Sequence, residues 1–162
     1  MNYFLIKEDD RIQRKLSFSV PGRFEDVSPY TVIQVSNSRP HDYVDWIDRP
    51  YRLLSDRMKS ILYKYNRLTP FKRIDLIDSE AGLHHPYWAV QPLSVKCLSP
   101  HTEWNPDSTI KRLVLDSKET KGQHFFAVEG ILEPYTFISL DAAESLLRRG
   151  FTGFVLKKVE LI

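Results

Sequence analysis

The sequence predicts an α+β fold, in which a single domain holds a mainly antiparallel or mixed sheet and two short helices. A strand, helix and strand pattern occurs twice at a nearly constant offset along the chain, and a serine precedes each helix, Ser55 in the first unit and Ser139 in the second. Runs of β-branched and aromatic residues between turn signals fill most of the remaining chain. We expect one sheet shared by both units, with the short helices covering it.

The two units begin with the same pattern of residues. Proline, tyrosine, any residue, two apolar residues and serine occupy residues 50–55 and again residues 134–139. The serines are natural N-caps, because a hydroxyl can accept a hydrogen bond from the first turn of a helix. Gly150 is placed to end the second helix. The expected apolar stripes are Leu54, Met58, Ile61, Leu62 and Tyr65 in the first helix, and Leu140, Ala143, Leu146 and Leu147 in the second.

Each unit closes with a predicted strand. Residues 71–77 and 156–162 both combine basic side chains with an apolar end, and their offset exceeds that of the capping serines by a single position. The echo indicates an internal duplication or a repeated packing scheme. Chance similarity is the alternative, since amphipathic helices followed by basic strands are common.

Further strands are expected outside these segments, at residues 3–6, 16–20, 30–35, 87–98, 112–115 and 124–128. Pro92 lies within the longest of them. Because proline has no backbone N–H, we expect that segment to break near Pro92 or to lie at a sheet edge.

Length and composition indicate one globular domain over residues 1–162, with a strand-rich N-terminal part over residues 1–49. A total of 17 Phe and Tyr with 3 Trp excludes a disordered polymer. The net charge of +2 lacks the basic excess of a dedicated nucleic-acid binder. The middle third is the basic one, and we expect its cations on a solvated surface. They are mainly Arg57, Lys59, Lys64, Arg67, Lys72 and Arg73.

The expected compartment is the cytoplasm. Cys97 is the single cysteine, so no internal disulfide can form, and a reducing environment fits best. The apolar stretch at residues 3–6 is too short for a signal peptide, and no run of about 18 apolar residues occurs. We therefore expect a soluble protein.

Residues that could support catalysis or metal binding are few. Cys97 could act as a nucleophile, but the local alternation places it on the apolar face of a strand. His101 and Glu103 could share one face of a strand, although a third metal ligand nearby is lacking. His84 and His85 would point to opposite faces of an extended segment. We expect no metal, no cofactor and no enzymatic activity, and the alternative is a small hydrolase or metal-dependent enzyme using Cys97 or His101 and Glu103.

Two segments combine aromatic side chains with charge or histidine, as recognition loops do. In residues 41–48, aspartates would steer a basic partner while Tyr43 and Trp46 would anchor it. The alternative is that the apolar side chains there, including Ile47, fold inward and the aspartates stay in water. Residues 83–88 pose the same choice, and for Trp88 and Trp104 core packing is favoured. The candidate partner-binding residues are Asp42, Tyr43, Asp45, Trp46, Asp48, His84, His85 and Tyr87.

The second unit resembles a known group of proteins. Residues 137–147 and the Gly-Phe-Thr-Gly turn of residues 150–153 are similar to the C-terminal part of bacterial immunity proteins of polymorphic toxin systems, in the eleventh and forty-third immunity families. Residues 55–65, 71–77 and 87–90 are similar to an earlier Ser-led helix and two strands of these families. The resemblance covers about residues 50 to 162, and residues 1–49 match only loosely.

The resemblance implies a non-enzymatic protein that binds and neutralises a cognate toxin in the bacterial cytoplasm. Its shared positions are capping serines, turn glycines and core aromatics, so it does not locate the toxin-binding surface. A third hypothesis is a weak nucleic-acid-binding module, which requires Lys64, Arg67, Lys72 and Arg73 to line one groove.

Overall fold

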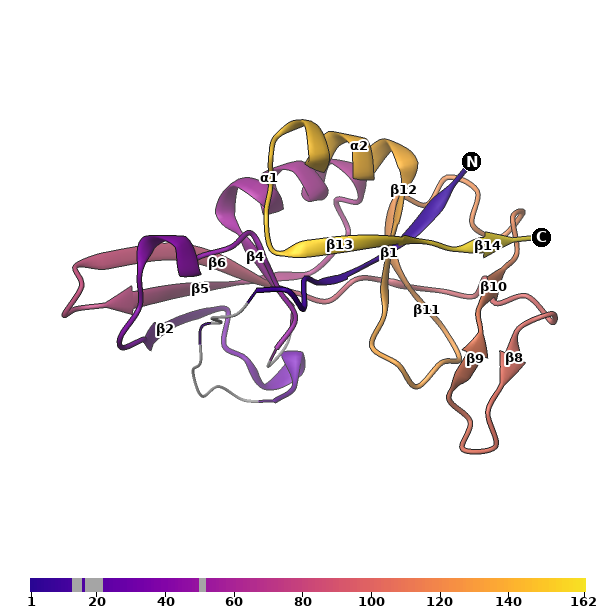
Figure 1. Ribbon diagram of the computed structural model, residues 1–162, viewed down its shortest axis with the longest axis horizontal. Coiled ribbons are helices and arrows are strands. Elements are labelled where there is room, and N and C mark those ends of the chain that lie inside the picture. Colours follow the sequence, from indigo (N-terminus) through magenta and orange to yellow (C-terminus); the bar gives the residue numbers. More distant parts are fainter. Residues whose placement is uncertain (13–15, 17–21, 50–51) are drawn as a thin grey trace.

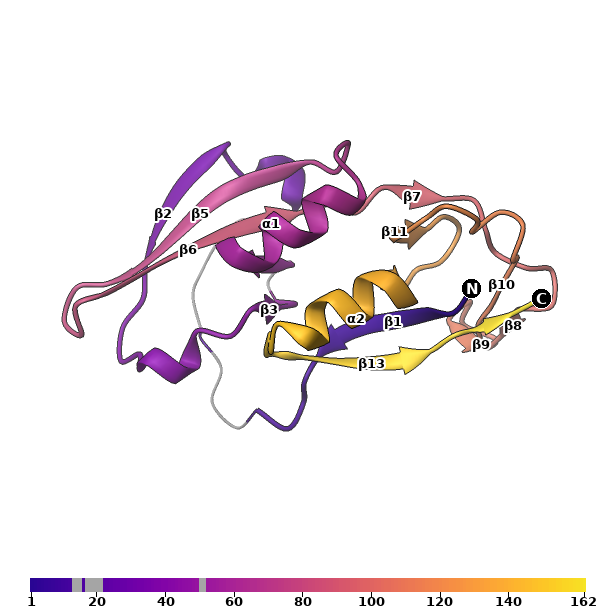
Figure 2. The ribbon, with the colours of Figure 1, turned by 90° about the horizontal axis from the view of Figure 1, so that it is seen from above.

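The computed structural model describes residues 1–12, 16, 22–49 and 52–162, and in this part of the chain two five-stranded sheets share a pair of helices. The helices, α1 (Asp56–Tyr65) and α2 (Leu140–Arg148), lie side by side on the same side of the molecule (Figures 1 and 2). The first sheet has the strand order β2 (Tyr30–Gln34), β5 (Phe71–Asp78), β6 (Leu83–Val90), β4 (Leu53–Ser55) and β3 (Trp46–Ile47). The second has the order β13 (Phe154–Lys158), β1 (Tyr3–Glu8), β12 (Thr136–Ser139), β11 (Phe125–Val128) and β7 (Ser94–Val95).

Smaller elements complete the fold. A hairpin of β8 (Glu103–Trp104) and β9 (Ile110–Arg112) projects away from the helices (Figure 1). β10 (Val114–Leu115) pairs with β14 (Glu160–Leu161) near the C-terminus. Two 3-10 turns, Phe24–Asp26 and Pro40–Asp42, flank β2. The result is the α+β architecture that the sequence predicts.

Both sheets contain a strand, helix and strand unit that is split by one antiparallel strand. β4, α1 and β5 follow one another in the chain, and β6 lies between the two strands and antiparallel to both. β12, α2 and β13 repeat this arrangement, with β1 in the place of β6. The expected repetition is present, but the expectation of one shared sheet is wrong. Each unit builds its own sheet, because each has its own antiparallel strand to complete it.

As far as Lys158, the strand pairings match residue by residue at the offsets read from the sequence. The expected strand 156–162 is divided there, because β13 ends at Lys158 and β14 pairs with β10 instead. Leu54 faces Trp88 across β4 and β6, and its counterpart in the echo, Ile138, faces Phe4 across β12 and β1. Arg73 faces Trp88, and its counterpart in the closing strand, Lys158, faces Phe4. Trp88 and Phe4 therefore occupy equivalent places. The antiparallel strand in the middle of each unit differs in its place along the chain. β6 comes after β4, α1 and β5, whereas β1 comes before β12, α2 and β13, so these two strands are not related by the constant sequence offset.

One hydrophobic core joins the two units beneath the helices. Equivalent positions of both units enter it in pairs, and the side chains of these pairs are almost completely buried. The pairs are Leu54 and Ile138, Met58 and Ala142, Leu62 and Leu146, Val90 and Ile6, and Trp46 and Phe125. The opposite face of each sheet has a separate core, which holds Leu53 and Ile47 in the first unit and Phe137 and Phe126 in the second.

The serines cap the helices as the sequence predicts. Each is the last residue of a strand, and its hydroxyl accepts from the third helical residue, Met58 N at 3.3 Å for Ser55 and Ala142 N at 3.2 Å for Ser139. Gly150 follows α2 with φ +67°, a conformation that favours glycine. The predicted apolar stripe of the second helix is wrong at one position, because the Leu147 side chain is 59% exposed.

The other strand predictions meet mixed outcomes. The segment 87–98 breaks around Pro92, since β6 ends at Val90 and β7 begins at Ser94. Residues 30–35 and 124–128 hold β2 and β11, whereas 112–115 divides between β9 and β10. Residues 17–20 of the expected strand 16–20, and the Pro50-Tyr51 start of the first unit, lie outside the described residues. Trp104 is 42% exposed rather than in the core.

Residues 1–49 do not form a separate part. They supply β1 to the second sheet and β2 and β3 to the first. Among the described residues, no helix is long and apolar enough to cross a membrane.

Candidate functional site

The predicted recognition segment 41–48 is a buried joint between the units, not an open loop. Trp46 is 0% exposed and lies in the shared core, so as the chain is folded it cannot anchor a partner at the surface. Asp42 and Asp45 are also buried, which contradicts both the expectation that they steer a partner and the alternative that they stay in water. The inward packing of Trp46 and Ile47 agrees with that alternative.

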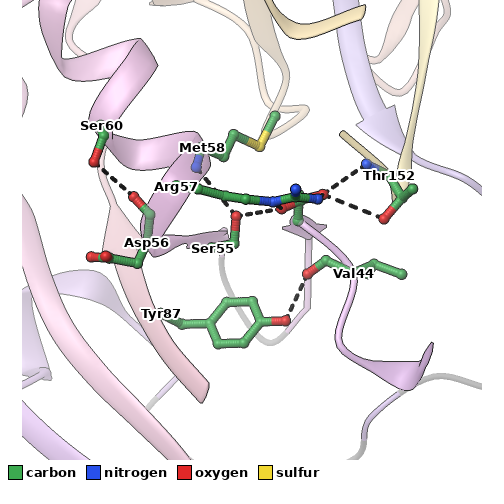
Figure 3. A network of polar contacts seen from close by, with 9 residues as sticks. Val44, Ser55, Asp56, Arg57, Met58, Ser60, Tyr87 and Thr152 are labelled. Atoms are coloured by element: carbon green, nitrogen blue, oxygen red, sulfur yellow. Dashed lines mark hydrogen bonds and ion pairs between the residues drawn. The ribbon is translucent and has the colours of Figure 1, made fainter. Parts of the chain in front are cut away.

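Asp45 has so many donors that burial of its carboxylate is compensated (Figure 3). The Ser55 hydroxyl donates to it at 2.6 Å, and the Arg57 guanidinium donates from Nε and Nη2, each at 2.8 Å. The Thr152 backbone N–H, from the loop after α2, donates at 2.9 Å. Burial alone would raise the pKa of Asp45, but these hydrogen bonds hold it below its usual value.

The second unit has a counterpart of Asp45. The backbone N–H of Ser55 donates to the Asp45 carbonyl, and that of Ser139 donates to the His124 carbonyl. The His124 ring also lies beside its capping serine, with Nδ1 2.8 Å from Ser139 Oγ. Each cap is thus supported by the residue just before β3 or β11. The first unit uses a carboxylate at this place, and the second uses an imidazole ring.

The two units are in close contact at Gly153, in the loop that leads from α2 into β13. A Cβ at this position would lie 2.7 Å from the Trp46 carbonyl oxygen and 2.8 Å from the Val44 side chain, and the glycine has φ +99°. The Thr152 carbonyl also accepts from the Asp45 and Trp46 backbone N–H groups. The Gly-Phe-Thr-Gly turn therefore joins the second unit to the start of the first.

The remaining residues of segment 41–48 support the same joint. The Asp48 carboxylate accepts from Glu8 N at 2.8 Å and from Trp46 Nε1 at 2.9 Å, and Asp48 is half-buried. Asp42 accepts from the Arg39 N–H at the start of a 3-10 turn. Tyr43 stacks on His85 with 3.9 Å between ring centroids. These contacts are structural.

The second predicted segment, residues 83–88, is not a loop, because it forms most of β6 and pairs with β5 along its length. Tyr87 is buried, and its hydroxyl donates to the Val44 carbonyl at 2.6 Å (Figure 3). Tyr3, at the equivalent place in β1, is likewise buried and donates to the Thr120 carbonyl. Tyr87 is therefore part of the repeated framework. His84 and His85 point to opposite faces, as expected, and His84 is exposed.

The residues of the alternative functions do not come together. Cys97 is buried, and burial, with Asp116 and Glu119 nearby, raises the pKa of its thiol to about 11. Glu103 pairs with Arg112 at 3.1 Å. In the described part of the chain, no three His, Cys, Asp or Glu side chains form a group that could hold a metal ion. Lys72 and Arg73 are adjacent on β5 and face opposite sides of the sheet, so they cannot line one groove.

A different surface collects exposed aromatic and charged side chains. The β5 and β6 hairpin extends well beyond the end of α1 (Figures 1 and 2), which leaves part of the helix side of the first sheet uncovered. We call this uncovered part, with the adjoining side of α1, the open face. Its residues are Tyr30, Val32, Arg73, Asp75, His84 and Trp88 of the sheet, and Asp56, Lys59 and Tyr63 of α1.

Trp88 lies at the centre of the open face and is held from several sides. Its Nε1 donates to Asp56 Oδ1 at 2.8 Å. The Lys59 ammonium lies 4.4 Å and the Arg73 guanidinium carbon 5.3 Å from the ring, while Phe71 meets it edge-on. The indole remains partly exposed. A fixed, partly exposed tryptophan beside cations is a typical anchor of protein interfaces.

Asp75 organises the other half of the open face. It accepts from Arg73 Nε at 2.7 Å and from the Tyr30 hydroxyl at 2.8 Å, and His84 Nε2 lies 3.6 Å away. Burial raises the pKa of Asp75. The hydrogen bonds from Arg73 and Tyr30 lower it by a larger amount, so the net shift is downward. Tyr30 is thereby fixed in place although it is 58% exposed.

Comparisons with known proteins leave the family open. No protein-family model matches the chain, and no curated protein is significantly similar to it. The resemblance to toxin-immunity families therefore stays a prediction.

Sequence reasoning missed most of the open face: His84 was a candidate, and Trp88 lay in the predicted segment 83–88 but was expected in the core, whereas it is partly exposed. The side chains of the open face come from three strands and a helix, and only the pairing of β2 with β5, and of β5 with β6, brings them together. Alternation along residues 30–34 and 71–75 would have placed Tyr30, Val32, Arg73 and Asp75 on common faces. The order of the strands had no signal in the sequence.

Proposed function

We propose that this protein is a non-enzymatic immunity protein that binds and neutralises a cognate toxin in the bacterial cytoplasm. The observation that carries the proposal is Trp88, held partly exposed on the sheet by Asp56 and flanked by Lys59 and Arg73. The resemblance of the second unit to immunity families supports the choice of a toxin as the partner. The toxin docks on the open face.

The chemistry of the open face defines the partner's surface. Arg73 is paired with Asp75, and Asp56 accepts from the indole, so most of the charge on this face is satisfied within the chain. Trp88 and Tyr30 then supply most of the binding energy by desolvation, and long-range steering is modest. The toxin presents an apolar patch to Trp88 and carboxylates or carbonyl groups to Lys59.

Co-expression tests the function. The tagged chain is produced together with the toxin domain encoded beside its gene, and both host survival and co-purification are measured. We expect the host to survive and the two proteins to elute as one stable complex. Death of the host with no complex formed, although the chain is produced and folded, would contradict the proposal.

A further inference from the structure

The open edge of the first sheet points to a second copy of this chain. Of the edge strands in the two five-stranded sheets described, β3 and β7 have two residues each, and β13 carries Lys157 and Lys158. Short length and lysine both discourage the addition of another strand at an edge. β2 has neither protection, because its five residues, Tyr-Thr-Val-Ile-Gln, include no charge and no proline.

Among the described residues, no strand and no backbone hydrogen bond reaches the outer edge of β2. β2 runs parallel to β5, and the Pro29 carbonyl accepts from Arg73 N at 2.9 Å while Val35 N donates to the Ile77 carbonyl at 2.8 Å. Alternate residues of a strand turn their N–H and C=O groups to the same side. Residues 29, 31, 33 and 35 therefore face β5, and Tyr30, Val32 and Gln34 present their backbone groups away from the sheet.

The same three residues are exposed. Tyr30 is 58% and Val32 46% exposed, and Gln34 is also exposed. Thr31 and Ile33, between them, are more covered. An edge with outward backbone groups, exposed β-formers and no charge is a template for another strand.

We infer that two copies of this chain associate by antiparallel pairing of β2 with β2, centred on Val32. Tyr30 then faces Gln34 of the second copy, Val32 faces Val32 of the second copy, and about six backbone hydrogen bonds form, two for each facing pair. The absence of charge makes this strand self-complementary, since a two-fold axis at Val32 would set any charge there against its own copy. The pairing of β2 with β2 requires no bound toxin.

The two-fold axis stands perpendicular to the sheet, so the open faces of both copies lie on one side of a continuous ten-stranded sheet. The two Trp88 residues, each on the third strand from the new contact, are then separated by about 24 Å in the direction across the strands, at the usual strand spacing. A dimer would present two toxin-binding faces side by side.

Sedimentation equilibrium of the full chain tests the pairing. We expect a reversible dimer at high micromolar concentration. Val32→Lys should raise the dissociation constant at least about 100-fold, because it sets like charges against each other at the axis. Leu132→Lys makes the same change at a residue that is 71% exposed, in the loop between β11 and β12, and should leave the dimer intact. A wild-type chain that is monomeric at all concentrations, or a dimer that Val32→Lys leaves unchanged, would overturn the inference.

Hydrogen exchange of the wild-type chain gives an answer even if the lysine variant does not fold. The amides of Tyr30, Val32 and Gln34 should exchange more slowly as the concentration rises, while those of the β8 and β9 hairpin stay unchanged. Exchange at these three amides that does not depend on concentration would also overturn the inference.

Discussion

The two units use one framework and differ most on the side that faces the helices. At equivalent places, the second unit has Phe4, which packs against the shared core, and the first has Trp88, which is hydrogen-bonded to Asp56; both rings are partly exposed. Lys59, which lies over Trp88, corresponds to Ala143, a buried residue of α2. Because the second unit folds with Phe4 and Ala143 at these two places, the architecture does not require the hydrogen-bonding indole of Trp88 or the cation of Lys59, although Arg73 has a basic counterpart in Lys158. This difference is the reason for assigning binding to the open face.

The units also differ in how they support their helix caps. Ser55 is backed by the buried carboxylate of Asp45, which holds Arg57 and the Thr152 backbone as well. Ser139 is backed by the His124 ring alone. The carboxylate that supports the cap of the first unit therefore also binds the loop after α2 in the second unit.

The largest expected effect tests whether the units contribute equally to the shared core. Trp46→Ala and Phe125→Ala should each lower the free energy of unfolding by about 3–5 kcal/mol, because both remove a fully buried aromatic ring. Denaturant unfolding measures this, with Leu147→Ala as the control, which should cost no more than about 0.5 kcal/mol. If one of these variants has almost the same free energy of unfolding as the wild type, the stability of the shared core comes mainly from the other unit.

A smaller effect should separate the two cap supports. Asp45→Ala should cost about 2–3 kcal/mol at neutral pH, because the Ser55 hydroxyl and the Thr152 N–H lose their acceptor. His124→Ala removes the hydrogen bond with Ser139 and a ring contact with Tyr65, 5.4 Å between centroids, but no charge, and should cost about 1 kcal/mol. Equal losses in thermal or denaturant unfolding would mean that the charge adds nothing to the joint.

The cost of Asp45→Ala should also depend on pH. The pKa of Asp45 is lowered in the folded chain, so its carboxylate stabilises the fold above the unfolded pKa of about 3.9. That contribution is lost as the pH falls through the lower, folded pKa. The difference between wild type and variant should therefore be constant near neutrality and shrink below about pH 4. A difference that grows on acidification would contradict the network around Asp45.

The smallest effect concerns the capping serines. Ser55→Ala and Ser139→Ala should each cost about 1 kcal/mol through the lost cap, and Ser55→Ala the more of the two, because Asp45 then loses a donor. Threonine at the same positions can still cap and should restore most of the stability. Helical content and unfolding midpoints of the four variants measure the effect, and alanine variants as stable as the wild type would argue against both caps.

Local signals in the sequence predict local structure well in this chain. The serine caps, the Gly150 stop and the strand at residues 71–77 depend on neighbouring residues, and the structure confirms them. The break near Pro92 follows from one missing N–H. These features need no knowledge of the distant chain.

The pairing of strands that are distant in the chain could not be predicted from the sequence. The sequence does not show that β1 completes the second unit, because a strand at the start of the chain takes a place that β6 takes after the first unit. The acidic and aromatic residues at 42–48 resemble a recognition loop, yet Arg57 and Thr152, distant in the sequence, supply the donors that let Asp45 be buried. The open face escaped prediction for the same reason.

The central claim is that the partner binds the open face around Trp88, and two tryptophans allow a matched test. Trp88 and Trp104 both reach the surface, but Trp104 lies on the β8 and β9 hairpin. Calorimetric titration with the toxin domain is made with wild type, Trp88→Ala and Trp104→Ala, after circular dichroism has shown that all three are folded. Trp88→Ala should weaken binding at least about 30-fold, as loss of a central aromatic anchor does, and Trp104→Ala should leave it unchanged. Wild-type affinity in folded Trp88→Ala, or an equal loss in both variants, would contradict the claim.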